Sequence, residues 1–461
     1  MKSLAFLLCA ILPSFVTPVD QEKDVEHHVQ VAPNQRIEIK GLSGSQIEFK
    51  SWEKNEVSIK LHVRISASDE EYEQDYVNHF EIEERKTDDA VFLTFHELRR
   101  SVSSGFWSLF KGSFIRKEIR GEVYVPQSNP LTTDFSYGSV NLAGMKGELN
   151  ILGKNNTLSL RDCENLRRVT NDYGETTVES SGGNLDLSGT SSTVTVMKFK
   201  GAASLEANYS TIKITDVARD ATVRCQSGKI TASGIGGNLS VKADYSTITV
   251  QDVKGHVNVE TKSGTLRMRN AGGMTVDAPY TTVEATDITG TSGKSASLSD
   301  QSGSVTLENL TGDLLLDCPY TTVSLTKISG AVDLSGKSST ITAREIGGDW
   351  KSATEYSTLR LKALKSGKVT ITNKSNGVDV ELVTVPKIVN IRNEYASISV
   401  TMPSGFSGDV DLEAEYGRVE TNLPVRVRNR DASGLAIGKV GTGTGTITLE
   451  TKSGNIELEQ R

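Results

Sequence analysis

Apolar and polar residues alternate along most of the chain after residue 136, in short runs separated by turn-forming residues. Residues 209–226, for example, read YSTIKITDVARDATVRCQ, and residues 245–262 read YSTITVQDVKGHVNVETK. Apolar residues two positions apart lie on one face of a β-strand. No long segment has the three-to-four-residue spacing of an amphipathic helix. The pattern therefore predicts an all-β protein built from short strands.

A tyrosine that precedes a small residue marks the start of an internal repeat. Nine tyrosines share this register, and the first four intervals between them are 36, 36, 36 and 35 residues. These nine, called here the tyrosine ladder, are Tyr137, Tyr173, Tyr209, Tyr245, Tyr280, Tyr320, Tyr356, Tyr395 and Tyr416. Midway between successive tyrosines comes a second start signal, such as Asn155-Asn156 or Ser263-Gly264. Each unit of 36 residues therefore consists of two units of 18.

Aligned units place apolar residues in fixed columns. The fourth column holds Val140, Leu158, Val194, Ile212, Ile230, Ile248, Leu266, Val283, Val305, Val323, Ile341, Leu359, Val378 and Ile398. One unit cannot bury its apolar face alone, so like columns must stack on one another. The sequence predicts a single-stranded β-helix, or β-solenoid, of 16 coils of about 18 residues, with half a coil at residues 453–461. Extra residues at 291–294 and 423–445 interrupt the register and are predicted to be surface loops.

Three domains are expected along the chain. They are a signal peptide at residues 1–19, a small mostly-β capping domain at 20–133 and the solenoid at 134–461. In the capping domain, residues 36–65 alternate as strands. Ser68-Asp69-Glu70-Glu71 resembles a capping box that opens a helix reaching about residue 78. Further strands are expected at residues 80–84 and 91–95.

Charge and cysteine usage narrow the class of protein. A net charge of −7 argues against nucleic acid as a partner. No segment after the signal reaches about 18 apolar residues, so no transmembrane segment is expected. The solenoid register separates Cys163, Cys225 and Cys318 by three or more coils, which is too far for a disulfide. We therefore expect the three thiols to be buried.

Residues 99–120 are basic and aromatic, unlike the rest of the chain. Within this segment, Trp107, Phe110, Lys111 and Arg116 are candidates for contact with a membrane surface or a partner. The alternative is that the aromatic side chains pack over the end of the solenoid.

The tyrosine ladder is a candidate ligand site, with Tyr209, Tyr245, Tyr280, Tyr320 and Tyr356 at its centre. Sugars bind flat on aromatic faces, and tyrosines on alternate coils would be about 9.6 Å apart, twice the spacing between strands. The alternative is that each tyrosine closes a corner and packs on the next coil.

The sequence signals for a metal site or a catalytic site are weaker than the signal for the tyrosine ladder. A partial acidic column follows the first strand of each unit, at Asp162, Asp216, Asp252 and Asp287, with Asn270 and Asn309 in the same column. Such oxygens could bind calcium or cap the turn, but the calcium-roll consensus is absent. No nucleophile motif and no metal-spaced Cys/His cluster occurs. We therefore expect no enzyme activity, no metal and no cofactor.

Three parts of the chain resemble the bacterial family of putative adhesins built from β-strand repeats. They are Gly44-Ser-Gln-Ile47 with Trp52 and Val57-Ser-Ile59, Val123-Tyr-Val-Pro126 with Ser136-Tyr137-Gly138-Ser139-Val140, and residues 441–456. The resemblance covers most of the chain after residue 19. It implies a right-handed β-helix in an exported protein of the periplasm, outer cell surface or extracellular space.

Together these features predict a non-catalytic adhesin or structural surface protein whose partner is a surface glycan or an envelope protein. A carbohydrate-active β-helix enzyme, such as a polysaccharide lyase or hydrolase, is the first alternative. An envelope scaffold that binds another protein is the second.

Overall fold

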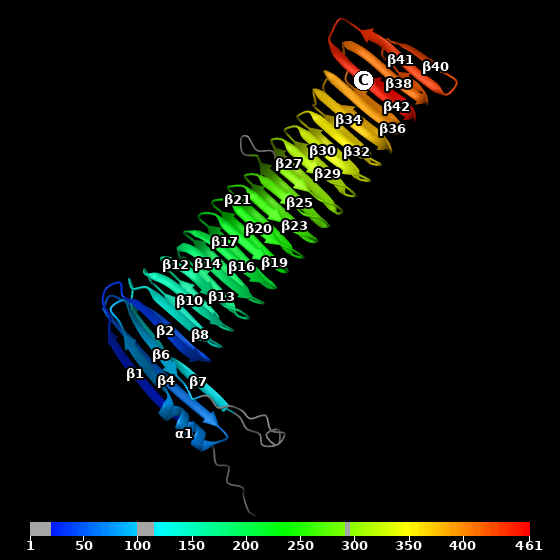
Figure 1. The fold of residues 1–461 in the computed structure, drawn as a ribbon. Helices are drawn as coiled ribbons and strands as arrows, with labels where there is room; N and C mark the ends of the chain where they lie inside the picture. The colour runs from blue at the N-terminus through cyan, green and yellow to red at the C-terminus, as the bar shows by residue number, and fades with distance from the viewer. Residues whose placement is uncertain (1–19, 99–114, 291–295) are drawn as a thin grey trace, which may run out of the picture. The chain divides into compact units, whose positions relative to one another are not determined.

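A computed structural model describes residues 20–98, 115–290 and 296–461. The predicted signal peptide therefore lies outside the described residues. Within them the protein is nearly all β, with the single helix α1 (Glu70–His79). The chain divides into two compact units, Met1–Thr157 and Leu158–Arg461. The strands form two sheets, which are described here unit by unit (Figure 1).

The N-terminal unit mixes antiparallel and parallel strand pairs. Its first sheet contains, in spatial order, β1 (Gln21–Gln30), β4 (Glu56–Ala67), β7 (Ile115–Pro126), β3 (Ser45–Trp52) and β9 (Ser139–Ala143). Its second sheet contains β5 (Glu81–Lys86), β6 (Ala90–His96), β2 (Arg36–Ser43), β8 (Leu131–Ser136) and β10 (Glu148–Lys154). The outer pairs β1–β4, β4–β7 and β5–β6 are antiparallel, and the others are parallel.

The helix of this unit begins one residue later than a Ser68 cap would give. Asp69 is the N-cap, and its Oδ1 accepts a hydrogen bond of 3.4 Å from the Tyr72 amide. This bond satisfies one of the amides that the first turn of a helix leaves without a partner. Tyr76 and Phe80 are buried beneath the helix, whose main contacts are with β4 and β1.

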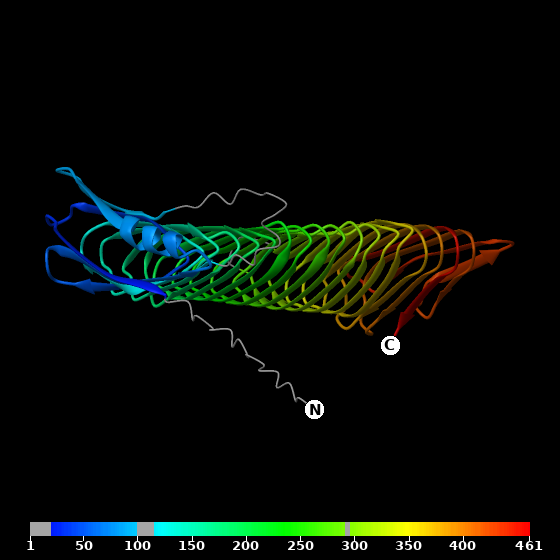
Figure 2. The same ribbon diagram turned by 90° about the horizontal axis from the view of Figure 1, so that it is seen from below.

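The C-terminal unit is a β-solenoid, and the solenoid has about 15 turns, one fewer than the 16 coils counted in the sequence. The turn length of about 18 residues agrees with the sequence prediction. Figure 2 shows the successive turns of this stack. The first sheet holds β11 (Thr157–Arg161), β13 (Glu175–Glu179), β15 (Thr193–Phe199), β17 (Ser210–Val217), β19 (Gly228–Ile235), β21 (Thr247–Val253), β23 (Gly264–Ala271), β25 (Thr281–Thr289), β27 (Ser304–Thr311), β29 (Thr322–Ile328), β31 (Thr340–Ile346), β33 (Thr358–Leu364), β35 (Val378–Leu382), β37 (Ile398–Met402), β39 (Val419–Thr421) and β43 (Ile456–Gln460).

The second sheet of the stack holds the return strands of the same turns and, near its end, the two strands β40 and β41 of a hairpin. They are β12 (Asn165–Thr170), β14 (Gly183–Thr190), β16 (Ala202–Asn208), β18 (Ala221–Cys225), β20 (Leu239–Ala243), β22 (Val257–Glu260), β24 (Met274–Asp277), β26 (Ala296–Ser299), β28 (Leu314–Asp317), β30 (Val332–Lys337), β32 (Trp350–Glu355), β34 (Lys368–Ser375), β36 (Ile388–Tyr395), β38 (Gly408–Tyr416), β40 (Arg426–Arg430), β41 (Ser433–Val440) and β42 (Gly445–Ser453).

Through the middle of the stack each residue lies opposite the one 18 positions further on. Ile212 pairs with Ile230, Ile230 with Ile248, and Ile248 with Leu266, all in parallel register. These four side chains are fully buried. Every residue of the predicted fourth column is likewise buried, so the inward assignment is confirmed.

The C-terminal end of the stack does not follow the order of the chain. The last turn in sequence, β42 and β43, lies inside, because β42 pairs with both β36 and β38 and β43 pairs with both β37 and β39. Residues 453–461 therefore complete an internal turn, and the prediction of a terminal half coil is wrong.

The predicted surface loop at residues 423–445 is also wrong. Most of this segment forms the antiparallel hairpin β40–β41, which extends the second sheet by pairing with β38. Without the hairpin, β38 would end the sheet with unpaired backbone groups. The other predicted insertion, at residues 291–294, lies outside the described residues.

Candidate functional site

The tyrosine ladder follows one corner of the turns, where the second sheet ends and the first begins again. Seven of its members, from Tyr137 to Tyr356, have φ between 50° and 60°. This left-handed conformation costs an L-residue other than glycine or asparagine about 1–2 kcal/mol. On alternate turns the same corner is taken by Ser191, Ser263 or Ser338, with φ of 52°, 58° and 53°. The conformation therefore belongs to the corner and does not depend on an aromatic ring.

The residue after the tyrosine closes the corner. On neighbouring turns Ser192 N donates to Ser210 Oγ at 3.0 Å, and Ser339 N donates to Ser357 Oγ at 3.1 Å. All four serines are buried. Where the corner residue is serine, glycine often follows: a Cβ on Gly264 would lie 2.2 Å from a backbone oxygen of the turn before. Small side chains at this position, and not the tyrosines, hold successive corners together.

The rings of the ladder point outward. The nine tyrosines are 45 to 65 % exposed. Two of them have specific polar contacts: Tyr209 Oη donates to Gln226 Oε1 at 2.9 Å, and the Lys374 ammonium lies 5.6 Å from the centre of the Tyr356 ring. Rings on alternate turns are about 9.6 Å apart, twice the strand spacing. This spacing leaves room for a flat group between them.

The internal position of the last turn restores the alternation of corner residues. In sequence, Tyr395 and Tyr416 follow one another without the usual serine corner between them. In space, Asn393 lies opposite Thr451, and Tyr416 lies opposite Ser453. Ser453 therefore occupies the corner between the two tyrosines. The regular spacing of the ladder extends to the end of the stack only because of this inserted turn.

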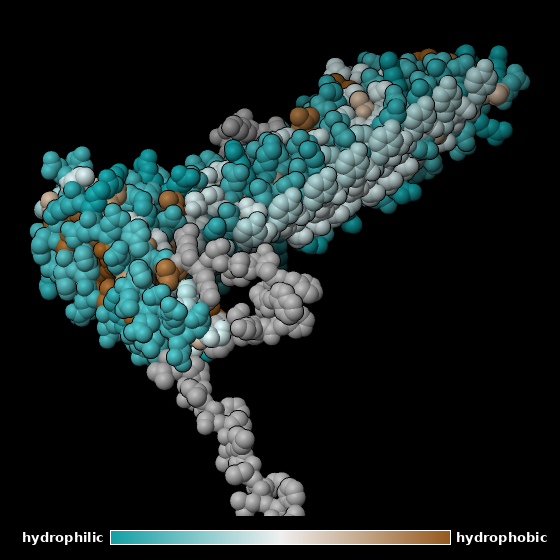
Figure 3. Space-filling view, turned by 60° about the horizontal axis from the view of Figure 1, so that its bottom comes forward, coloured by the Kyte–Doolittle hydropathy of each residue, from teal (hydrophilic) through white to brown (hydrophobic). Residues whose placement is uncertain are grey.

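Figure 3 shows a pale band that runs along the stack between strongly hydrophilic surfaces. Pale colour marks residues of intermediate hydropathy, such as serine, threonine, glycine and tyrosine. One face of the stack thus has few charges along its length, which suits contact with a long neutral ligand.

The comparisons with known proteins concern this same stack. A sequence model of the Toastrack DUF4097 family matches residues 164–459, well over half of the chain. The chain belongs to the Toastrack DUF4097 family. The family resemblance inferred from the repeat motifs is therefore confirmed at this level. No curated protein matches the Toastrack chain.

Two solved structures are similar to the Toastrack chain over most of its length. One is a putative cell adhesion protein from Clostridium sporogenes ATCC 15579, with 10 % identity, a TM-score of 0.15 and coverage of 96 % of this chain and 100 % of its own. The other is the putative adhesin BF0245 from Bacteroides fragilis NCTC 9343, with 11 % identity, a TM-score of 0.14 and coverage of 74 % and 97 %. Neither overlay is close enough to carry residue roles to this chain.

The acidic column of the Toastrack stack lies at a second left-handed position, with φ of 51° to 57° at its six predicted members. Amide and carboxylate pair between turns: Asn270 Nδ2 donates to Asp252 Oδ1 at 2.6 Å, and Asn309 Nδ2 donates to Asp287 Oδ1 at 3.1 Å. Among residues 20–98, 115–290 and 296–461, no three His, Cys, Asp or Glu side chains are placed to hold a metal ion. The contacts favour the turn-capping interpretation of this column.

A groove of about 930 Å³ runs beside this column. Its lining includes Lys198, Asp216, Asp252, Lys254 and Asn270. Its lining carries charges of both signs together with apolar and small residues. This mixture gives the groove no concentrated field for one class of charged ligand.

Among the described residues of the Toastrack stack, Asp300 is the one buried carboxyl group. Asp300 lies beneath the tyrosine corner, where its Oδ1 accepts from the Ser302 amide at 3.3 Å. Its Oδ2 has no hydrogen-bond partner among the described residues. Burial raises the pKa of this carboxyl above its ordinary value. Burial, with the nearby Asp300 charge, also raises the pKa of the Cys318 thiol to about 12.

The three cysteines of the stack are buried, as expected from their columns. Cys163 Sγ also donates to the Arg161 carbonyl at 3.2 Å. A thiol with no access to solvent and a raised pKa reacts slowly, so Cys318 is an inert core residue.

The basic aromatic segment is only partly described. Trp107, Phe110 and Lys111 lie outside the described residues. Arg116 is exposed near the start of β7, opposite Ser66 of β4. Arg116 is therefore the one candidate of the four whose position the structure describes.

A second basic group was missed in the sequence. Arg426, Arg428 and Arg430 lie on β40, in the segment expected to be a loop. The signal that could have revealed them is the alternation Arg-Val-Arg-Asn-Arg, which is typical of a strand.

No helix among the described residues is both long enough and apolar enough to cross a membrane.

Proposed function

We propose that this Toastrack protein is a non-catalytic surface or envelope protein that binds an extended glycan along the tyrosine ladder. The observation that carries the proposal is the row of exposed rings held at corners that need no ring. Serine occupies the same corner on alternate turns with the same φ. The aromatic side chains are thus superfluous for the corner, while their exposure makes them available to a ligand.

The chemistry of the tyrosines suits sugars better than other ligands. A tyrosine offers an apolar face for the C–H groups of a sugar ring and a hydroxyl for hydrogen bonding. The charged side chains beside the ladder include pairs of opposite sign, such as Lys262 with Asp244 and Lys337 with Glu355, which offset one another. A charged polymer would meet little electrostatic attraction there.

The regular spacing of the tyrosine rings would give avidity for a polymeric glycan. Each ring supplies a weak contact, but a polymer that engages several rings converts later contacts into intramolecular ones. An adhesive protein would gain in this way from a long ladder. The predicted signal peptide at residues 1–19 places the protein, in this proposal, in the periplasm, on the outer cell surface or outside the cell.

The test is a glycan array probed with the purified chain from residue 20, followed by calorimetry on each bound glycan. The decisive variant carries Tyr209→Asn, Tyr245→Asn and Tyr280→Asn, because asparagine tolerates the left-handed corner. If each ring contributes about 0.5–1.5 kcal/mol, each substitution weakens binding about 2- to 13-fold. The melting temperature of the variant should stay close to that of the parent.

A matched control is Leu315→Asn, since Leu315 is an exposed apolar residue on the stack, 52 % exposed, outside the ladder. It should leave binding unchanged. Unchanged affinity in the triple tyrosine variant would contradict the proposal. Release of shortened sugars would instead indicate a carbohydrate-active enzyme, and silence on every glycan would favour a scaffold for an envelope protein.

A further inference from the structure

The hairpin at the C-terminal end of the stack carries a row of arginines without partners. Arg426, Arg428 and Arg430 alternate along β40 and therefore share one face of the strand. They lie opposite Ile437, Leu435 and Ser433 of β41, and all five residues of β40 are exposed. Within the described parts of the chain none of the three arginines forms an ion pair. Such a row is unexpected in a protein with a net charge of −7.

The strand that carries these arginines is an edge. Among the described strands β40 pairs only with β41, so its other side presents backbone amides and carbonyls without strand partners. The inner face of the hairpin contacts the stack: the Asn429 side chain donates to Val419 O at 3.1 Å and accepts from Val419 N at 3.0 Å. The free edge and the outward arginines remain available for an additional strand.

A second edge, in the N-terminal unit, carries the opposite charge. Among the described strands β1 pairs only with β4. Asp20 and then Glu22, Asp24 and Glu26 alternate along it, so these four carboxylates share one face with the same two-residue spacing as the arginines.

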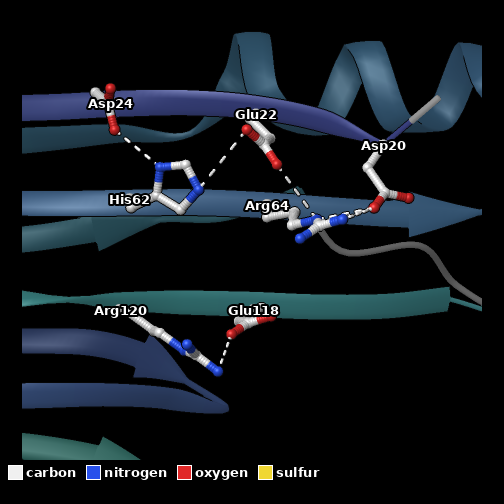
Figure 4. A network of polar contacts seen from close by, with 7 residues as sticks. All are labelled: Asp20, Glu22, Asp24, His62, Arg64, Glu118 and Arg120. Atoms are coloured by element: carbon white, nitrogen blue, oxygen red, sulfur yellow. Dashed lines mark hydrogen bonds and ion pairs between the residues drawn. The ribbon is translucent and has the colours of Figure 1, made fainter.

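Figure 4 shows how part of this acidic row meets β4. Asp20 and Glu22 pair with Arg64, the latter at 3.3 Å, and the Asp24 carboxylate accepts from His62 Nδ1 at 2.9 Å. At the far end of the row Glu26 lies 3.4 Å from Lys60. On this face the charge alternates by strand, with carboxylates on β1 and basic side chains on β4.

The acidic row is not neutralised by its neighbours. The four carboxylates face Arg64, Lys60 and His62 of β4. Arg116 of β7 also lies near Asp20, but the Glu118 carboxylate lines the same small pocket. The side chains of Asp24 and Glu26 are 84 % and 63 % exposed. If the alternation of charge between neighbouring strands continues, a strand added beyond β1 should carry basic side chains on this face.

We propose that copies of this protein associate head to tail, with β40 of one copy pairing as an added strand with β1 of the next. Pairing of two β40 edges would place arginine against arginine, and pairing of two β1 edges would place carboxylate against carboxylate. Only the mixed pair brings opposite charges together at a matched spacing. The same arginines thus discourage association of like ends, a common role of charge on edge strands, and select the acidic edge.

The experiment is analytical ultracentrifugation of the whole chain from residue 20, at several concentrations. Assembly should be strong at low ionic strength and should disappear at high salt, because the screening length falls from about 10 Å at 0.1 M to about 3 Å at 1 M. One variant carries Arg426→Glu and Arg428→Glu, and a second carries Glu22→Lys and Asp24→Lys. Neither should assemble alone, with at least about a tenfold loss of association in each.

Mixing the two variants is the decisive step. Each mixed contact again joins opposite charges, so the mixture should assemble where the separate variants do not. The matched control carries Arg360→Glu and Lys362→Glu, two exposed cations with the same spacing on β33 in the middle of the stack. It should assemble like the parent.

Restoration by mixing also guards against misfolding, since an unfolded variant could not restore assembly. Circular dichroism checks each variant beforehand. A parent chain that stays monomeric at low salt would overturn the proposal, as would a mixture that fails to assemble from two folded variants. Binding of an anionic polymer to a chain that remains monomeric would likewise assign the arginines to another partner and overturn it.

Discussion

The middle of the stack and its C-terminal end are built from the same 18-residue unit but are organised differently. In the middle, each turn pairs with the turns before and after it in sequence, as the chain of pairs from Ile212 to Leu266 illustrates. At the end, the last turn of the chain lies between two earlier ones, and an antiparallel hairpin follows outside.

This difference shows that a middle turn and a terminal turn have different structural requirements. A middle turn needs only an apolar interior and a corner that small residues can close, because identical neighbours cover both sides. A terminal turn has a neighbour on one side only, so its open edge needs a different structure. The N-terminal unit also ends in antiparallel strands, at β1 and at β5. Antiparallel strands therefore form the edges of the sheets in both units.

Removal of the last turn should have the largest effect. Truncation after residue 444 deletes β42 and β43 and with them the buried side chains Ile447, Leu449, Ile456 and Leu458. At about 1.5–3 kcal/mol for each buried side chain, the loss is on the order of 6–12 kcal/mol. Hydrogen exchange should show loss of protection in β36 and β38 and little change in the middle of the stack.

The control for this truncation is replacement of the hairpin β40–β41 by a short glycine–serine linker. Every residue of β40 is exposed, and Ala436 is the buried apolar residue of the hairpin. The linker variant should therefore keep protection in β36. Equal loss of protection in both variants would mean that the internal turn has no special role.

A single truncation in the middle of the stack should have a smaller effect. Ile248→Ala should lower the free energy of unfolding by about 2–5 kcal/mol, because it removes buried methyl groups and leaves a cavity. Ile248 is fully buried between Ile230 and Leu266. Denaturant titration measures the change. Thr247→Ala on the same strand, at an exposed position, should change stability by less than about 0.5 kcal/mol.

Asp300 gives the smallest and the most specific test, since it is a carboxyl in a column of otherwise small uncharged residues. Its raised pKa means that the folded chain keeps a proton which the unfolded chain releases above the ordinary value of 3.8. The folded state therefore loses stability as the pH rises from below 3.8 to above the raised pKa.

Asp300→Asn should remove this dependence. The variant should be more stable than the parent at neutral pH by about 1–3 kcal/mol, the cost of a buried polar group without a partner. Thermal melts from pH 3 to pH 8 measure the difference, which should vanish at the acidic end. A difference that stays constant with pH would show that burial does not shift the pKa of this carboxyl, because stability varies with pH only where the folded and unfolded chains bind different numbers of protons. Asn373 and Asn393 already occupy equivalent buried positions on other turns.

The candidate site was predicted in part. The identity and spacing of the ladder tyrosines are written in the sequence, because each ring recurs in one register of the repeat. Their left-handed φ and outward direction are not, since both depend on how the corner closes against neighbouring turns. The arginine row on β40 was missed because a segment that breaks the repeat was assumed to be a loop.

The sequence by itself determined the unit: its length of 18, the inward columns, the corner tyrosines and the burial of the cysteines. These follow from local alternation and from the rule that like columns stack. The tertiary structure alone decided the order of turns at the end of the stack and the strand β1 at the beginning. The physical reason is that a repeat specifies the surface that each turn offers, and every turn offers nearly the same one. Which turn occupies which place is then settled by the ends, where the chain must cover edges that have no further copy to pair with.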